Sequence, residues 1–153
     1  MKTRTADSEP TRNQNGSACA NLFISIIVPI RNEALFIAQS LNSLLAQDYP
    51  RDRFEILVVD GMSTDGTLAI VSELAANTSQ IRVFPNPLRL SSAGRNVAIH
   101  EARGDVLLIV DGHCELSRRD YLGKLNASFQ RNDVDCVGRP LEVAGVTAFE
   151  RAI

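Results

Sequence analysis

The stretch FEILVVDGMSTDGT, residues 54–67, decides the fold class of this chain. Its first six residues are dominated by apolar and β-branched side chains, the pattern of a strand that is covered on both faces of a parallel sheet. Asp60 follows at the end of the strand, and a polar turn then leads into a helical pattern of Thr67, Ile70, Val71 and Leu74. A buried strand, a polar turn and a helix in this order predict a βα unit of an α/β domain.

The same alternation continues on both sides of this stretch. We expect further strands at 23–28, 81–84 and 106–110 and a fifth at 134–137, with helical patterns between them. Pro29 should end the first strand, because proline cannot donate to a central ladder. Asn32 is expected to cap the next helix, and Gly104 should end the helix before the strand at 106–110. Strands alternating with helices predict a mostly parallel, Rossmann-like sheet flanked by helices.

Length and composition place the chain among globular proteins. Its 153 residues suggest one domain, and 44% hydrophobic and 22% charged residues are ordinary values. The formal net charge is −2, so nothing predicts nucleic acid or an anionic membrane as a partner.

Residues 1–22 are polar and contain no apolar core of a signal peptide, so we expect a disordered leader before a domain at 23–153. The most apolar stretch, 23–30, is far shorter than the roughly 20 residues that span a bilayer, so we expect no membrane segment in this chain. The three cysteines show no CxxC spacing and predict a reducing cytoplasm. The inner face of the membrane is a second location for a full-length form.

Polar residues follow three of the expected strands: Arg31, Asn32 and Glu33 after the first, Asp60, Ser63 and Asp65 after the second, and Asp111 and His113 after the fourth. Ligands of open α/β sheets bind at the carboxyl ends of the strands. Carboxylates gathered there are costly unless a cation or hydrogen-bond donors compensate them. The pattern therefore predicts a divalent metal, a ligand with donor groups, or both.

Each of these residues also has a simpler interpretation. Asn32 and Asp65 could serve only as helix caps, and Asp60 with Gly61 could form only a turn. His113 could be an ordinary loop residue. Their combination at several strand ends favours a binding site.

These turns can be compared with those of three other α/β folds that have a site at the strand ends. The turn PIRNEA at 29–34 lacks the glycines of a dinucleotide-binding fingerprint, and no GxxxxGK[ST] phosphate loop occurs. A receiver-like signalling domain resembles the chain around Asp60. The lysine expected there at a late strand end is missing, because Lys2 and Lys124 lie elsewhere. The receiver-like domain stays as an alternative.

Specific motifs resemble those of family 2 glycosyltransferases. They are IIVPIRNE at 26–33, FEILVVDGMSTDGT at 54–67, SAGRN at 92–96 and GDVLLIVDGH at 104–113. Their order and spacing cover roughly residues 23–140, and the DGH variant with VGRP at 137–140 is similar to succinoglycan-type exopolysaccharide transferases. The resemblance implies a GT-A fold.

The resemblance also implies roles for individual residues. The nucleotide pocket would be formed by Pro29, Arg31, Glu33, Asp60, Ser63, Arg95 and Asp111. Asp60 would accept a hydrogen bond from the base, uracil being favoured, and Arg95 would donate to the base or a phosphate. Asp111 and His113 would hold a divalent metal, Mn²⁺ being favoured over Mg²⁺ because His113 stands where the family has a second Asp.

The implied function is metal-assisted, inverting transfer of a sugar from a nucleoside diphosphate sugar, favoured as UDP-linked, to a polysaccharide or lipid-linked acceptor. The chain resembles only the N-terminal portion of the family, so we expect a truncated domain without the acceptor site and the catalytic base. Neither Glu142 nor Glu150 sits in a recognisable motif, and the base stays unassigned. A non-catalytic nucleotide-binding fragment is a further alternative.

Overall fold

The computed structural model describes residues 21–131 and 134–138. They form a four-stranded parallel sheet in the order β3-β2-β1-β4. The strands are β1 (Ile24–Ile30), β2 (Phe54–Asp60), β3 (Ile81–Pro85) and β4 (Val106–Ile109). The α/β class with a parallel sheet is confirmed. This order is that of the dinucleotide-binding folds, whereas receiver domains have the order 2-1-3-4-5, so the receiver-like alternative is wrong.

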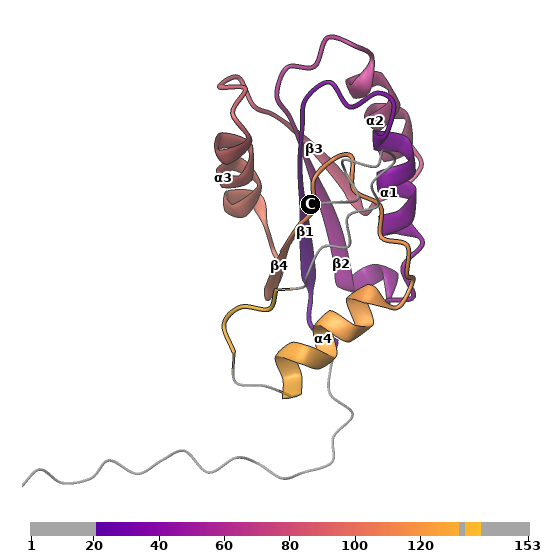
Figure 1. Ribbon diagram of the computed structural model, residues 1–153, viewed down its shortest axis with the longest axis vertical. Helices are drawn as coiled ribbons and strands as arrows, with labels where there is room; N and C mark the ends of the chain where they lie inside the picture. Colours follow the sequence, from indigo (N-terminus) through magenta and orange to yellow (C-terminus); the bar gives the residue numbers. More distant parts are fainter. Residues whose placement is uncertain (1–20, 132–133, 139–153) are drawn as a thin grey trace, which may run out of the picture.

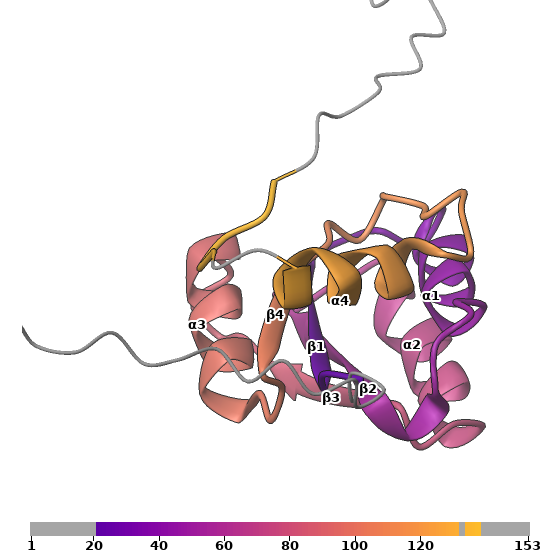
Figure 2. The same cartoon turned by 90° about the horizontal axis from the view of Figure 1, so that it is seen from below.

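The helices cover both faces of the sheet (Figures 1 and 2). Helices α1 (Ile37–Leu45) and α2 (Thr67–Ala76) pack on one face, together with α4 (Tyr121–Arg131), and α3 (Ser91–Glu101) packs on the other. A short 3₁₀ turn, η1 (Arg51–Arg53), precedes β2. The winding changes direction between β1 and β4, which makes the carboxyl ends of these two strands the switch point of the sheet. Within the described part of the chain, no helix is both long and apolar enough to cross a membrane.

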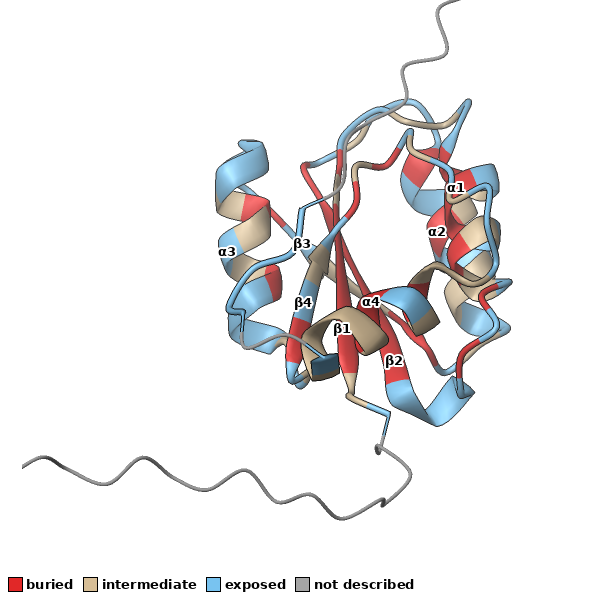
Figure 3. Ribbon diagram, turned by 60° about the horizontal axis from the view of Figure 1, so that its bottom comes forward, coloured by how far each residue is buried: buried red, intermediate tan, exposed pale blue. Residues whose placement is uncertain are grey.

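The central strands β1 and β2 are mostly apolar because both of their faces are buried (Figure 3), and the polar residues Ser25, Glu55 and Asp60 are buried with them. Alternate residues of β1, from Ile24 to Ile30, join the larger core under α1, α2 and α4. Ile27 points the other way and packs with Leu57, Val59 and Ala98 under α3. Two-sided burial explains why periodicity of two is absent from these strands.

Strand β4 is an edge of the described sheet, and its outer face is less covered. Leu107 is 45% exposed and Ile109 is 49% exposed, on the face that α3 shares. The fifth strand expected at 134–137 is not formed, because those residues are exposed and pair with no strand. A short apolar run becomes a strand only where a neighbouring edge pairs with it.

The expectation that Pro29 ends the first strand is wrong. Pro29 lies inside β1, in register with Val59 of β2. Neighbouring residues of a strand direct their hydrogen bonds to opposite sides, and the carbonyl of Ile27 accepts from Val110 on the β4 side. The nitrogen of Pro29 therefore faces that same side, beyond Ile109, the last paired residue of β4. No ladder bond is lost there, so the proline is tolerated.

Gly104 is needed for close packing and not for ending a helix. Its φ is not positive, and a Cβ at this position would lie 2.5 Å from the backbone nitrogen of Ser25. The N–H of Gly104 donates to Ser25 Oγ over 2.8 Å, and Ser25 Oγ donates to the buried carboxylate of Glu55 over 2.8 Å. This contact brings the chain from the end of α3 directly onto the sheet.

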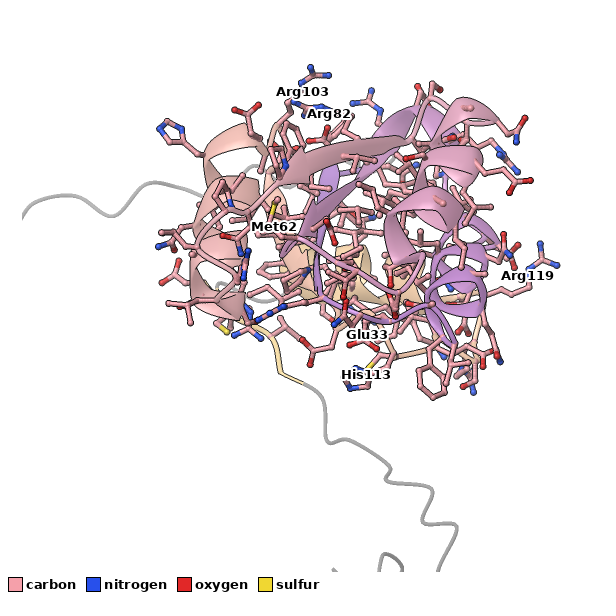
Figure 4. All side chains as sticks on the ribbon, turned by 90° about the horizontal axis from the view of Figure 1, so that it is seen from above. Glu33, Met62, Arg82, Arg103, His113 and Arg119 are labelled. Atoms are coloured by element: carbon pink, nitrogen blue, oxygen red, sulfur yellow. The ribbon has the colours of Figure 1, made fainter. Side chains whose placement is uncertain are left out.

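Glu55 is the charged centre of this end of the sheet. Its carboxylate accepts from the N–H of Arg103 over 2.9 Å and from Nη1 of Arg82 over 2.8 Å, and Figure 4 shows the two arginines side by side. Burial acts to raise the pKa of Glu55, but the hydrogen bonds from Arg82 and Arg103 outweigh it and hold the pKa below its usual 4.5. The ionised carboxylate therefore stabilises the junction between β2, β3 and the end of α3.

The expected leader, residues 1–22, lies outside the described residues except for Asn21 and Leu22. Leu22 is bonded to the domain: its N–H donates to Asn126 Oδ1 over 3.2 Å, and its carbonyl accepts from the hydroxyl of Tyr49 over 2.7 Å.

Candidate functional site

A cavity of about 400 Å³ opens at the carboxyl ends of the strands. It is built by the loops that follow all four strands and by the first turns of α3, and the switch point between β1 and β4 lies in it. Its lining comprises Pro29, Ile30, Arg31, Glu33, Val59, Gly61, Asn86, Arg89, Leu90, Ser91, Arg95, Asp111, Gly112 and His113. The structure thus gathers side chains more than 80 residues apart in one site.

Most of the residues predicted for the site line this cavity, and two do not. The lining includes Pro29, Arg31, Glu33, Arg95, Asp111 and His113. Asp60 and Ser63 lie beside it, next to the lining residues Val59 and Gly61.

Asp60 is only 4% exposed and is held by Ser63. The N–H of Ser63 donates to both carboxylate oxygens, over 3.2 and 3.1 Å, and its hydroxyl donates to Oδ1 over 2.5 Å. The carboxylate therefore has a fixed position at the wall of the cavity, and one oxygen, Oδ2, accepts a single one of these bonds.

Asn32 joins the loops after β1 and β2 and does not cap a helix, so the capping expectation is wrong. Helix α1 begins four residues after Glu33, at Ile37. The side chain of Asn32 accepts from the N–H of Thr64 over 2.8 Å, and its own N–H donates to Ser63 Oγ over 2.9 Å. Its φ of 57° is a left-handed conformation that asparagine tolerates better than most residues. This left-handed conformation differs from the extended backbone that an N-cap residue typically adopts.

Asp65 does act at the start of α2, as its simpler interpretation had it, and it also holds the neighbouring loop. Its carboxylate accepts from the N–H and the hydroxyl of Thr67 and from the N–H of Ala34, over 3.1 Å. The bond from the Thr67 hydroxyl is the main cause that lowers the pKa of Asp65 below its usual 3.8.

Three arginines, Arg31, Arg89 and Arg95, line the cavity. Arg95 Nη2 is 3.4 Å from Asp111 Oδ1, and its Nε is buried without a hydrogen-bond partner among the described residues. An unpaired buried donor costs about 1–3 kcal/mol, and this one belongs to a residue that lines the cavity. Guanidinium groups match phosphate oxygens in geometry and charge.

Asn86 and Arg89 are site residues that the sequence analysis missed. Asn86 is 4% exposed, and its Nδ2 donates to the carbonyl of Leu90 over 2.8 Å, which closes the loop between β3 and α3. Arg89 has a φ of 59° within this loop. In the sequence, Asn86 lies just after the strand expected at 81–84, and no local signal marked Arg89.

Asp111, Gly112 and His113 form a tight turn after β4. The N–H of Cys114 donates to the carbonyl of Asp111 over 2.9 Å, and a Cβ on Gly112 would lie 2.7 Å from Cγ2 of Ile30. Only glycine therefore allows this turn to pack against the end of β1.

Glu33 orients the imidazole of His113, and Figure 4 shows the two side chains together at one edge of the molecule. Glu33 Oε1 is 3.3 Å from His113 Nδ1, which leaves the Nε2 of the ring for another partner. A carboxylate behind a histidine is a common support for a metal ligand. Donor atoms of Asp111, His113 and Cys114 all lie within 4.8 Å of one another.

Comparisons with known proteins define the class of this domain. Residues 25–151 match the family described as "Glycosyl transferase family 2". Glycosyltransferase AglE of Haloferax volcanii is 33% identical over 133 residues, which are 84% of this chain and 43% of AglE. Succinoglycan biosynthesis protein ExoA of Rhizobium meliloti is 30% identical over 129 residues, 83% of this chain and 38% of ExoA.

Solved glycosyltransferase structures are also similar to this chain in fold. The mannosyltransferase PcManGT of Pyrobaculum calidifontis, in complex with GDP-Man and Mn²⁺, has a TM-score of 0.68 and 32% identity, over 79% of this chain and 37% of its own. Staphylococcus aureus TarS 1–349 in complex with UDP has a TM-score of 0.65 and 31% identity, over 77% of this chain and 38% of its own.

The fold is that of the GT-A glycosyltransferases. The chain belongs to glycosyltransferase family 2, and it spans between 37% and 43% of the length of the relatives named above.

Proposed function

We propose that this chain carries the donor site of an inverting glycosyltransferase that transfers a sugar from a UDP-linked donor to a polysaccharide or lipid-linked acceptor. The observation that carries the proposal is the cavity at the switch point, where three arginines, Asp111 and His113 line one space and Arg95 lies 3.4 Å from Asp111. Support comes from TarS, whose structure contains UDP, and from ExoA, which is named for succinoglycan biosynthesis. We place the protein in the cytoplasm, where nucleotide sugars are the donors.

Different residues of the site would bind different parts of the donor. Asp60, fixed by Ser63 at the wall of the cavity, would accept the N3–H of uracil. Arg95 would offer its unpaired Nε to the diphosphate, and Arg31 and Pro29 would bound the pocket on the β1 side.

The donor atoms present fit a divalent cation. Asp111 supplies a carboxylate and His113 an imidazole, with side chains that are 48% and 56% exposed and contact Arg95 and Glu33, respectively. Imidazole suits Mn²⁺ better than Mg²⁺, so we propose Mn²⁺ for this pair. A cation held there would stabilise the charge that develops on the departing diphosphate.

Titration calorimetry with UDP and Mn²⁺ tests the donor site on the 153-residue chain. Arg95→Ala removes hydrogen bonds from a charged donor, worth about 1.5–3 kcal/mol, so the affinity for UDP should fall about 10- to 100-fold. Arg119→Ala is the matched control, because Arg119 is 69% exposed, contacts exposed Asp48 and the carbonyl of Ala46, and lies away from His113 in Figure 4. Its loss should leave UDP binding unchanged.

Calorimetry tests the donor site, and an activity assay separates the proposal from its rival, a nucleotide-binding fragment without catalytic function. A parent chain that does not bind UDP, or an Arg95→Ala chain that binds it equally well, would refute the assignment of the donor site. UDP binding without any hydrolysis or transfer of a UDP-sugar by a longer form of the protein would favour the rival.

A further inference from the structure

We infer that Cys114 is a third metal-binding residue and gives the site next to β4 a preference for a borderline-soft divalent cation such as Zn²⁺ or Co²⁺. The inference rests on the proposed function, because it uses the same Asp111–His113 pair; that pair alone suits Mn²⁺, and the added thiolate moves its preference to Zn²⁺ or Co²⁺. It adds a sulfur ligand that the site needs for this selectivity.

The geometry brings one donor of each kind to one place. A carboxylate oxygen of Asp111, a ring nitrogen of His113 and the Sγ of Cys114 lie within 4.8 Å of one another, and no other such group of three occurs among residues 21–131 and 134–138. Donors around a tetrahedral zinc ion lie about 3.3–3.8 Å apart, given metal–ligand distances of about 2.0–2.3 Å. The exposed side chains of Asp111 and His113 can move by the ångström that is needed.

The sulfur is the fixed member of the group. Cys114 is partly buried and packs against the main core, and its N–H is bonded to the carbonyl of Asp111 over 2.9 Å. Gly112 keeps this turn tight against Ile30, and Glu33 holds the imidazole from behind. The more exposed side chains of Asp111 and His113 would therefore move toward the fixed thiol of Cys114 when an ion binds.

The donor set determines which ions bind. Thiolate and imidazole favour Zn²⁺ and Co²⁺ over Mn²⁺, and they suit Mg²⁺ and Ca²⁺ poorly, because those ions prefer oxygen. Three protein ligands leave at least one position of a tetrahedral ion open, which a diphosphate oxygen could take. Zn²⁺ should therefore displace Mn²⁺ from this site.

Cobalt spectroscopy without nucleotide tests the sulfur ligand directly. The reference protein is the 153-residue chain with Cys19→Ser and Cys136→Ser, which leaves Cys114 as its single thiol. Kept reduced and titrated with Co²⁺, it should develop the near-ultraviolet sulfur-to-cobalt charge-transfer band. Adding Cys114→Ser should abolish the band. It should also weaken Co²⁺ binding by more than about 10-fold, the loss expected when a residue that only supports a metal ligand is removed.

Competition between metals provides a measurement that needs no variant of Cys114. Zn²⁺ should remove the cobalt band from the reference protein at far lower concentration than Mn²⁺, and Mg²⁺ should not remove it. Far-ultraviolet circular dichroism checks that Cys114→Ser is folded, and Cys114→Ala replaces it if it is not.

No charge-transfer band at saturating Co²⁺, or equal Co²⁺ affinity with and without the Cys114 thiol, would overturn the inference. UDP binding is titrated separately with Mn²⁺. If UDP binds and the band is absent, only the sulfur ligand fails. If the band appears and UDP does not bind, the metal site stands and the proposed function fails.

Discussion

Replacing Gly112 by alanine should disturb both the stability of the domain and its donor site. The new Cβ would lie 2.7 Å from Ile30 Cγ2 and 3.3 Å from Glu33 Cγ, whereas carbon atoms in contact are about 3.5–4.0 Å apart. Ile30 is β-branched and 4% exposed at the end of β1, so it cannot turn away. The turn must therefore shift by roughly an ångström.

The size of the effect follows from two opposing terms. Overpacking of this kind costs about 1–3 kcal/mol, and alanine returns about 0.4–1 kcal/mol by restricting the unfolded chain. The φ of Gly112 is not positive, so no backbone strain adds to the cost. We expect the free energy of unfolding to fall by about 0.5–2.5 kcal/mol. The turn also carries Asp111 and His113, so Mn²⁺-dependent UDP binding should weaken about 10- to 100-fold, as when a metal ligand loses its support.

Gly123→Ala is the matched control for this experiment. Gly123 lies within α4, and a Cβ there would meet nothing within 4 Å. Alanine is favoured over glycine inside a helix by about 0.8–1 kcal/mol, so this variant should be stabilised. Urea denaturation and calorimetry with UDP are measured on both proteins. If Gly112→Ala is as stable as Gly123→Ala, the reasoning about close packing is wrong. If it is less stable but binds UDP like the parent, the turn after β4 is not part of the donor site.

Three further substitutions separate binding from folding. Asp60→Ala should weaken UDP binding about 10- to 100-fold and lower the free energy of unfolding by about 1–3 kcal/mol, since Ser63 loses its acceptor; lower stability with unchanged UDP affinity would limit Asp60 to a structural role. Glu33→Gln should weaken Mn²⁺ binding about 10-fold or more, measured by calorimetry, and full retention would show that Glu33 does not support the metal site. Arg82→Gln should lower stability by about 1.5–3 kcal/mol near pH 7. Because the folded pKa of Glu55 lies below 4.5, the stability from this pair is present above pH 4.5 and is lost as pH falls through the folded value. The difference between Arg82→Gln and the parent should therefore shrink in urea denaturation below pH 4.5, and a constant difference would contradict the assignment.

The sequence by itself determined the class of fold and the family. The apolar runs at 54–59 and 106–110 predicted strands covered on both faces, and the structure places both as parallel strands; the first is buried on both faces, whereas Leu107 and Ile109 of the edge strand β4 are about half exposed. The ends of these strands carry Asp60 and Asp111, because residues that follow a strand must emerge at its carboxyl end. Those features depend only on neighbours along the chain, so local patterns sufficed to predict them.

The tertiary structure alone decided how the pieces meet. Pro29 stays inside a central strand only because β4 has no paired residue at that level. Asn32 bonds to the loop that follows β2, 31 residues further on, and so does not cap its own helix. Such contacts depend on the order of the strands in the sheet, which no window of neighbouring residues contains.

The composition of the cavity was also a product of the strand order. Arg89 and Asn86 join the site because β3 and α3 lie beside β2 and β1, and no local signal in their own segment distinguishes them from an ordinary connection. Cys114 was visible as the residue after His113, but its distance to two other donors is set by the turn that Gly112 permits. The sequence determined which chemical groups the chain possesses at each strand end; the packing of the sheet determined which of them line one cavity.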